Sequence, residues 1–509
     1  MSNKYPNLPG VNINVKDGQL AITNSRTANS ILIIAEAKTS KTVPEGPVYV
    51  SNQEELYENF GGYFYQGQLN PIAAQWVVAY KAGVNNVYLM ALGQEDKKRQ
   101  FVDLYNKLFE YVVDLQVSHV VLDGLYADEE ITDLTAADFG VESIEDVSLP
   151  RLFSYDANTA PTSLVAPATL TVRNVNTSEE IVLTLDTGEV DVKDLNKQIQ
   201  EAVQTYSSNM SGRVTLKGSN VSLLFDVPVE LTGEEALTAL GLTDVVEEQK
   251  IVGSPASLLA QYAEQISEEI GGTIAYIATS APASYDLAGI KQHTDKLAGM
   301  NTQISPYLQI IAGPEVGVTV PGSLRTQWVS GVTHYAVLVN SLLPQFAATN
   351  RALTGVNQLR FNFSPRQLNT LVGNKFVTFH TKNGSVRVVD AVTTAPDLAV
   401  GVDIIKSDFT RLSTLRIMNY VISTIREICE TFIGSPNQLE NYNAMNTAIR
   451  ASLDDTAERG IIQDARYSIN LGESLDTAEI ELTILPQFEL RTVNTTIALS
   501  RPELFGTQE

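Results

Sequence analysis

The sequence has few of the residues from which metal and nucleophilic sites are built. Its 509 residues include one cysteine and four histidines. A single cysteine forms no intrachain disulfide, so nothing indicates an oxidising compartment. Cys429 falls within an amphipathic helical pattern, and we interpret it as a packed structural cysteine. The histidines stand singly, without the H-x-x-x-H spacing of a helical zinc site, at positions 119, 293, 334 and 380.

Motifs for nucleotide binding and nucleophilic catalysis are also missing. The sequence contains no G-x-x-x-x-G-K-[ST] loop, no G-x-G-x-x-G after a strand and no G-x-S-x-G elbow. Acid pairs such as Asp454-Asp455 are adjacent, and neighbours on a helix point in different directions. We therefore predict no catalytic, metal or cofactor-binding residue, and we favour a structural role over catalysis.

Basic residues are scarce. The chain has 35 Lys and Arg against 59 Asp and Glu, a formal net charge of −24. Residues 121–250 alone contain 24 acidic against 7 basic residues, which is −17 of that total. Phosphate binding needs clustered Lys and Arg, so the charge disfavours nucleic acid and anionic lipid as direct partners. A solvated acidic face that maintains solubility is the simplest interpretation.

Long apolar runs and a secretory signal are not found either. The start, MSNKYPNLPG, has no basic region followed by an apolar one, and no run approaches the length of a membrane span. We expect a protein that folds in the cytoplasm and does not insert into a membrane. With 44% hydrophobic and 18% charged residues, the chain has the composition of a folded protein of roughly three domains.

Strands alternate with helices in two stretches, which predicts an α/β core with a mostly parallel sheet. The first stretch has expected strands at 30–37, 85–92 and 119–125, and expected helices at 53–60, 71–82 and 97–115. The second has expected helices at 258–270 and 284–299, strands at 273–280 and 307–313, and a largely helical segment at 322–343. We assign 29–151 plus 254–350 to one α/β domain.

The intervening segment, 152–253, differs in pattern and predicts a small, acidic, inserted α+β domain. Two alternating strands are expected within 167–188, a helix at 194–209, and a hairpin at 212–227 that turns at 217–220.

A C-terminal α+β domain is predicted over 351–486. Asn383-Gly384 signals a tight hairpin, because both central residues of that turn need positive φ. Apolar residues at three- and four-residue spacing predict a helix over 408–433, and a second helix is expected at 437–458. Strands are expected at 465–471 and 478–485, the latter with Ile480, Leu482 and Ile484 on one face, and again at 488–499.

The two ends read as arms, at 1–28 and 487–509. Pro6 and Pro9 oppose helix at the N-terminus, and Val11, Ile13 and Val15 then alternate with polar residues as in a short strand. A short strand is unstable alone in water and must join a sheet. The pattern leaves open whether that sheet belongs to the same subunit or to another.

Read in order along nearly the whole chain, several segments resemble the contractile phage tail sheath protein family. They are PNLPGVNINV (6–15), ILIIAEAKTSKTVPEGPVYVSNQEELYENFGG (31–62), RLSTLRIMNYVISTIREICETFIGSPN (411–437), GIIQDARYSIN (460–470) and TAEIELTILPQFELRTVNTTIAL (477–499). VDAVTT (389–394) departs from the family, which has an aromatic-Gly-Ala-Arg-Thr stretch there. The acidic insertion is similar to the family's variable, outward-facing modules only in kind.

The resemblance implies a structural subunit, not an enzyme, without cofactors, in a virion tail assembled in the host cytoplasm or in a related contractile injection system. It implies six-fold rings of copies stacked around a tail tube protein, with baseplate and tail terminator proteins as further partners. Contraction would drive the tube through a target envelope.

The family's arms join a neighbour's sheet by strand addition. By resemblance, the donated strands carry Val11, Ile13 and Val15 at the N-terminus and Leu490, Val493, Ile497 and Leu499 at the C-terminus. Arg411, Arg416 and Arg426 are the residues that the resemblance suggests for tube contact, and a solvated helix face is the alternative for each.

Two other classes stay open. An α/β enzyme with a nucleotide-binding core needs a glycine-rich turn after its first strand, and KTSKTVPEGP (38–47) lacks one. A monomeric adhesin or receptor-binding module is the second, and the acidic insertion would serve it.

Overall fold

The computed structural model describes residues 30–489 with gaps. Outside the description lie 1–29, 85, 94–95, 113–114, 116, 142–150, 155–165, 175–177, 188–197, 199–211, 218–219, 226–228, 241–249, 270–271, 301, 314, 401–402, 436–437, 472–477 and 490–509. Three expected elements therefore fall outside the described residues: the strand at 11–15, the helix at 194–209 except Gln198, and nearly all of the strand at 488–499.

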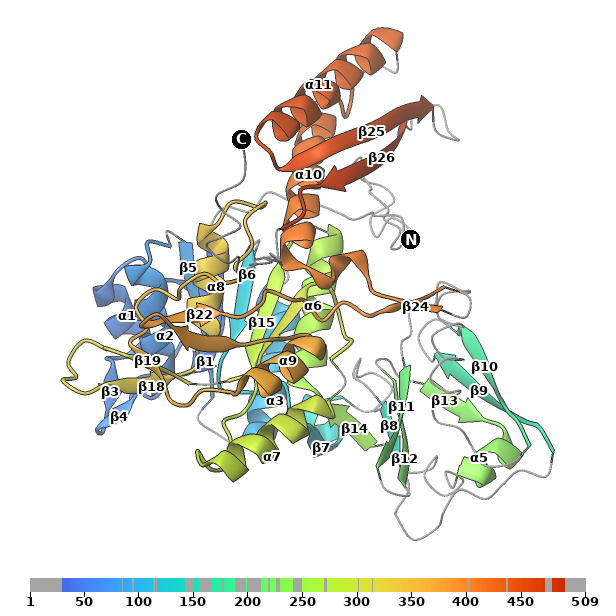
Figure 1. Ribbon diagram of the computed structural model, residues 1–509. Helices are drawn as coiled ribbons and strands as arrows, with labels where there is room; N and C mark the ends of the chain where they lie inside the picture. The colour runs from blue at the N-terminus through green and yellow to red at the C-terminus, as the bar shows by residue number, and fades with distance from the viewer. Residues whose placement is uncertain are drawn as a thin grey trace, which may run out of the picture.

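A seven-stranded sheet forms the centre of the body, in the order β2-β5-β1-β6-β15-β16-β20 (Figure 1). Its strands are β1 (Ser30–Glu36), β2 (Val48–Tyr49), β5 (Asn86–Leu92), β6 (His119–Leu122), β15 (Ile274–Ala278), β16 (Leu308–Ile311) and β20 (Phe376–Val377). All neighbours pair in parallel except β2 with β5. Since β5 and β6 flank β1 on opposite sides, the strand order reverses there, as in doubly wound folds.

Helices cover both faces of this sheet, which explains why β1 reads as the unbroken apolar run SILIIAE. On one side α2 (Pro71–Lys81) and α8 (Val332–Ser341) pack against β1, β6 and β15, with α1 (Gln53–Phe60) beside α2. On the other side lie α3 (Lys97–Lys107), α6 (Pro255–Glu269) and α7 (Leu287–Ala298). Trp76 of α2 is buried and donates its indole N–H to the Val50 carbonyl at 3.2 Å.

Helix starts follow the expected capping chemistry. The Asn52 side chain accepts the Glu55 backbone N–H at the start of α1, and Gly61 ends that helix with a positive φ. The expected helix 97–115 is shorter than predicted: α3 ends at Lys107, and a single π turn, Leu108–Val112, follows it. Its amphipathic pattern continues into the π turn, so hydropathy alone did not mark this change.

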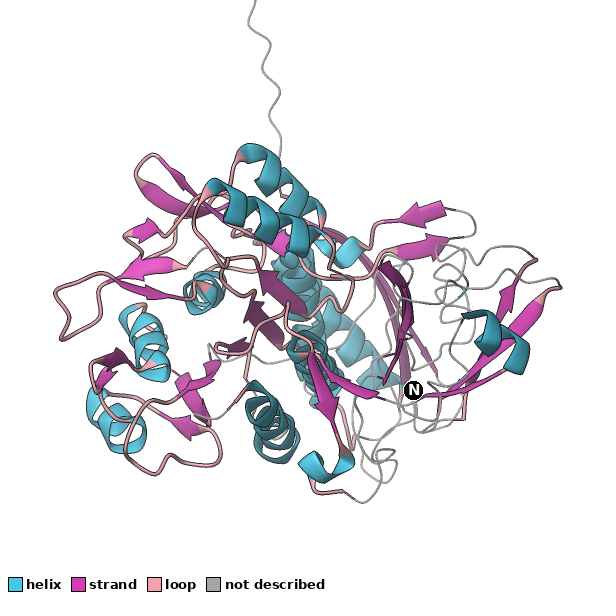
Figure 2. Cartoon of the chain, turned by 90° about the horizontal axis from the view of Figure 1, so that it is seen from below, coloured by secondary structure: helices cyan, strands magenta, loops and turns pink. Residues whose placement is uncertain are grey.

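A smaller lobe of two sheets stands to one side of the body (Figures 1 and 2). One sheet has the order β10-β9-β13, and the other β11-β12-β8-β14-β7. Their bounds are β7 (Ile131–Leu134), β8 (Arg151–Ser154), β9 (Ala168–Asn174), β10 (Glu180–Leu185), β11 (Gly212–Lys217), β12 (Asn220–Phe225), β13 (Val229–Thr232) and β14 (Lys250–Gly253), with the helix α5 (Glu234–Leu240) and the 3₁₀ turn Ala136–Phe139. Lys217 pairs with Asn220, as the predicted hairpin requires.

The expected largely helical segment 322–343 is wrong in its first half. Trp328 lies in the strand β18 (Gln327–Val329), which pairs with β17 (Val316–Val318), and the helix α8 begins only at Val332. Gly331 separates the two, and a Cβ there would come within 2.6 Å of Phe379 Cε2. Phe379, which is distant in the sequence, packs closely against the start of α8. The local spacing of apolar residues gives no information about this contact.

Residues 358–405 are rich in short strands, as predicted. These are β19 (Gln358–Leu359), β21 (Phe379–Lys382), β22 (Ser385–Val388), β23 (Leu398–Val400) and β24 (Asp403–Ile405), with α9 (Pro365–Gly373) and, earlier in the chain, the hairpin β3 (Phe64–Tyr65) and β4 (Gln68–Leu69). Asn383 and Gly384 both have positive φ, 52° and 73°, which confirms the predicted tight turn. β20, however, joins the central sheet.

A long helix leads away from the body to the C-terminal elements (Figure 1). After a 3₁₀ turn, Asp408–Thr410, come α10 (Leu412–Glu430), α11 (Leu439–Glu458), β25 (Ile462–Leu471) and β26 (Ala478–Pro486). The observed fold is therefore mixed α/β with a parallel-strand sheet and several small sheets, as expected. The domain limits at 151, 253, 350 and 486 stay predictions.

Candidate functional site

The C-terminal hairpin is the element most suited to contact another chain. β25 and β26 pair antiparallel, from Ile462↔Pro486 to Leu471↔Ala478, with one register shift near Ile462. Among the described residues no third strand joins them. Both outer edges of this ribbon therefore present backbone groups without a strand partner in the described chain.

One face of the hairpin packs on the chain's own helices. Three cross-strand pairs share this face: Ala465 with Ile484, Tyr467 with Leu482, and Ile469 with Ile480. The Tyr467 hydroxyl lies 2.7 Å from Asn446 Oδ1 of α11. The predicted common face of residues 480, 482 and 484 is thus confirmed, and the pleat fixes which side of the hairpin stays exposed.

Helices α10 and α11 support the hairpin through apolar stripes. Leu415, Met418 and Ile422 of α10 are buried, as are Ile449 and Leu453 of α11. This is the three- and four-residue spacing that predicted both helices. Cys429 is buried in the same region, and burial raises the pKa of its thiol to about 11, which suits a packing role.

Arg411 is engaged within its own subunit. Its Nη1 lies 2.8 Å from Asp390 Oδ2 and 3.8 Å from Glu489 Oε1. The Asp390 side chain is only 4% exposed, while that of Arg411 is 24% exposed. The guanidinium therefore neutralises a buried carboxylate and also lies near Glu489, at the start of the predicted C-terminal arm.

The other two arginines also make contacts inside the chain. Arg416 donates to the carbonyls of Leu342, Leu343 and Phe346, just after the end of α8. Arg426 is half-buried, and burial lowers the pKa of its guanidinium while Glu430 opposes that shift. Contact between these three arginines and a tail tube stays a prediction.

The seven arm residues lie outside the described residues. These are Val11, Ile13, Val15, Leu490, Val493, Ile497 and Leu499.

The four histidines do not converge. Three are buried, and His380 is half-buried next to the hairpin turn. His119 Nδ1 lies 2.9 Å from the Tyr276 hydroxyl, and burial lowers the pKa of His119 to about 3 and that of His334 to about 4. In the described part of the chain, no three His, Cys, Asp or Glu side chains group in a way suited to a metal ion.

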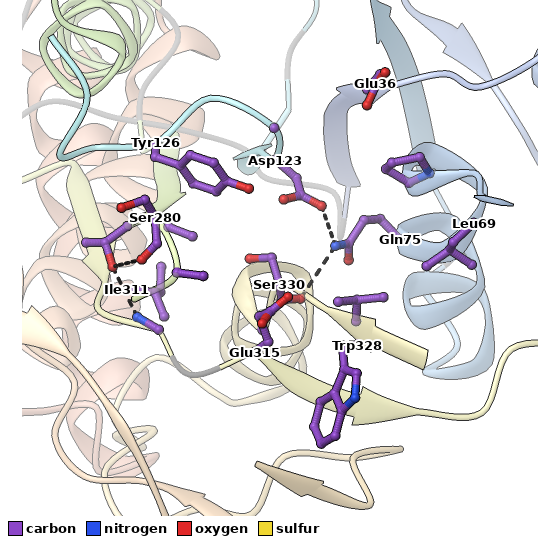
Figure 3. A pocket seen from close by; sticks show the side chains of 18 of the residues that line it. Glu36, Leu69, Gln75, Asp123, Tyr126, Ser280, Ile311, Glu315, Trp328 and Ser330 are labelled. Atoms are coloured by element: carbon purple, nitrogen blue, oxygen red, sulfur yellow. Dashed lines mark hydrogen bonds between the residues drawn. The ribbon is translucent and has the colours of Figure 1, made fainter. Parts of the chain in front are cut away.

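A pocket of about 440 Å³ lies where the parallel strands of the central sheet end (Figure 3). Glu36 ends β1, Asp123 follows β6 and Ser280 follows β15, and all three line it. This is the crevice in which open α/β sheets bind ligands. No motif in the sequence predicted this pocket, although polar residues directly after buried strands were a usable signal.

None of the helices in the residues described has both the length and the apolar character that a bilayer crossing requires.

Comparisons with known proteins establish the fold class. No family model matches the chain, and no curated protein matches it in sequence. Among solved structures, a chain of the anti-feeding prophage (AFP) baseplate is 11% identical with a TM-score of 0.50, over 97% of this chain and 99% of that one. At this identity the likeness shows a common fold.

Two further structures are similar at lower scores. A chain of the PVC sheath complex, an extracellular contractile injection system in the contracted state, is 11% identical with a TM-score of 0.49, over 97% of each chain. The sheath tail protein of Listeria innocua is 12% identical with a TM-score of 0.41, over 92% of this chain and 94% of that one.

Proposed function

We propose that this chain is a structural subunit of a contractile tail sheath. Copies would polymerise into a helical cylinder around a tail tube, and contraction of the cylinder would drive the tube through a target envelope. The observation that carries the proposal is the fold match to an AFP baseplate chain over nearly the full length of both chains. The collinear motifs that resemble tail sheath proteins support it independently.

The terminal arms are the proposed links between subunits. Strands from other copies would join the open edges of the β25–β26 hairpin. One copy would donate the N-terminal strand with Val11, Ile13 and Val15. Another would donate the C-terminal strand with Leu490, Val493, Ile497 and Leu499. A two-stranded ribbon is marginal alone, and added strands would satisfy its edge groups. Its apolar face already packs on the chain's own helices, β25 on α11 and β26 on α10, so additional strands extend a supported surface.

The energy per link is modest. A backbone hydrogen bond contributes about 0.5–1.5 kcal/mol net, so four or five per arm give a few kcal/mol. The two arms of each subunit would together secure a lattice. Contacts between unlike surfaces that do not close into a ring continue as an open helical filament. These links between arms and hairpins would persist while the bodies of the subunits rotate and repack during contraction.

The remaining partners follow from the same proposal. Stacked six-fold rings would surround a tail tube protein and end at baseplate and tail terminator proteins, in a virion tail or tail-like particle assembled in the host cytoplasm. The acidic lobe, set to one side of the body in Figure 1, would face outward. A tube contact through Arg411 or Arg416 would have to replace bonds that these residues make within the subunit.

Deletion of residues 1–16 tests the arm directly. We expect a folded protein, with an unchanged circular dichroism spectrum, that forms no tubes in negative-stain micrographs. Two full-length variants form a matched pair. Replacing Val11, Ile13 and Val15 by serine should abolish assembly, whereas replacing Asn12 and Asn14 by serine should not. Normal tubes from the deletion would show that the arm assignment is wrong.

A further inference from the structure

The pocket at the end of the parallel strands lies apart from the C-terminal hairpin and has no part in the proposed assembly. It holds about 440 Å³ and is lined from both halves of the central sheet. Figure 3 shows Gln75 and Asp123 side by side on its wall, with Glu315, Ser330 and Trp328 facing them.

Asp123 is a carboxyl group buried in the lining of the pocket. The residue is 9% exposed, and Oδ2 accepts the Gln75 amide at 2.6 Å. Among the described residues, no lysine or arginine forms an ion pair with it. A buried carboxylate without a cationic partner is costly, and a bound cation would remove that cost.

Gln75 supplies a second, independent sign of a missing donor. It is 1% exposed, and its amide nitrogen is used by Asp123 and by the Ser330 carbonyl at 3.4 Å. Its Oε1 has no hydrogen-bond partner in the described chain. Buried amide oxygens are normally satisfied, and this one is enclosed by protein, so it marks a shortage of donors beside Asp123 and not a ligand contact.

The other charged groups that face Asp123 are already occupied. Lys97, the only cationic side chain among the described lining residues, donates to the Gly124 carbonyl, lies 3.5 Å from Glu129 and sits 4.7 Å from the Tyr126 ring centroid. Glu315 pairs with Arg360 at 2.6 Å. Lys97 therefore forms no ion pair with Asp123, although its charge acts on that carboxyl group.

Aromatic and apolar groups complete the lining. Tyr126, Trp328 and Phe361 contribute rings, and Leu69 and Pro71 contribute aliphatic surface. Lys97 already lies over the Tyr126 ring and Arg360 lies 5.7 Å from the Trp328 ring centroid, so these walls favour the carbon skeleton of a ligand over a hydrated metal ion. No suitable cluster of metal ligands is present among the described residues.

We propose that this pocket binds an organic cation, whose ammonium group donates to Asp123 while its carbon chain packs on Trp328. The shared chemistry is a primary alkylammonium. A free diamine and a lysine side chain of another protein are two sources of it.

Calorimetric titration of the full-length protein tests the proposal, with putrescine and Nα-acetyl-lysine amide as probes and Mg²⁺ as the comparison. We expect saturable binding of at least one alkylammonium probe at one site per chain, weakened about tenfold or more in Asp123→Asn. If only putrescine binds, the natural ligand is a free diamine. If the lysine amide binds more tightly, the natural ligand is a lysine side chain of another protein.

Asp454→Asn is the control variant, because it removes a carboxylate that is 72% exposed on α11. It should bind the probes like the unaltered protein. If Asp123→Asn does not fold, Trp328→Leu serves instead and should weaken binding at least severalfold.

The pH dependence gives a second readout. Burial raises the pKa of Asp123, with Glu315 adding to the shift and Gln75 and Lys97 opposing it. Affinity should therefore fall as the pH decreases, beginning above the ordinary range of an aspartate. Three results would overturn the proposal. They are equal affinity of Asp123→Asn and the unaltered protein for the amines, binding of Mg²⁺ alone, and no binding of either amine at millimolar concentration.

Discussion

Replacing Arg411 by methionine should destabilise the subunit, because it leaves the Asp390 carboxylate buried without its cation. The two groups are 2.8 Å apart, and the Asp390 side chain is 4% exposed. Removing one partner of a buried pair costs about 3–5 kcal/mol, and the partial exposure of Arg411 reduces this to about 2–3 kcal/mol. Methionine keeps most of the aliphatic volume, so the loss reports mainly on charge.

Urea unfolding followed by circular dichroism measures this effect, and a double-mutant cycle isolates the pair. Asp390→Asn removes the carboxylate, so Arg411→Met should cost about 1–2 kcal/mol less in that background. Arg450→Met is the control: this arginine is 77% exposed and 4.0 Å from Asp454, and its loss should cost less than about 0.5 kcal/mol. If Arg411→Met unfolds like the unaltered protein, the guanidinium is free for contacts outside the subunit and our placement of it is wrong.

Two further perturbations probe the body. Gly331→Ala should lower the free energy of unfolding by about 1–3 kcal/mol, because the new Cβ would lie 2.6 Å from Phe379 Cε2. Gly373→Ala is the control in the same urea assay, because a Cβ at that position meets nothing within 4 Å. Stability should also fall between pH 6.5 and about 4, because buried His119 and His334, with pKa values lowered to about 3 and about 4, stay neutral in the folded protein while the unfolded chain binds protons. Each histidine contributes about 2 kcal/mol to the difference in the free energy of unfolding between pH 7 and pH 5. His334→Phe should therefore remove roughly half of that difference. An unchanged midpoint over this range would contradict the burial of both rings.

Local chemistry predicted much of the fold. The capped helix at 53–60, the Asn383-Gly384 turn and the apolar stripe of α10 each depend on residues within a few positions of one another, and each is found where expected. The strands of the central sheet were likewise evident, since a strand buried on both faces reads as an unbroken apolar run.

The errors occurred where distant residues decide the structure. Trp328 adopts a strand because β17 lies beside it, and α8 starts late because Phe379 packs at Gly331. The pairing of Arg411 with Asp390 and Glu489 joins three parts of the chain that share no local pattern. Pairing of this kind is a tertiary property, which periodicity does not encode.

Part of the candidate site was equally hidden. The common face of Ile480, Leu482 and Ile484 follows from strand alternation, but the contact of their strand with α10 does not. Asp123 follows the parallel strand β6, but Gln75 comes from α2 and Ser330 lies between β18 and α8. Their meeting at one pocket depends on tertiary packing, which the sequence does not state.

Negative-stain electron microscopy of the purified full-length chain tests the central claim most directly. The proposed sheath function predicts hollow tubes, or rings that stack into tubes as the concentration rises. A protein that stays monomeric at every concentration, with no rings or tubes in the micrographs, would contradict it.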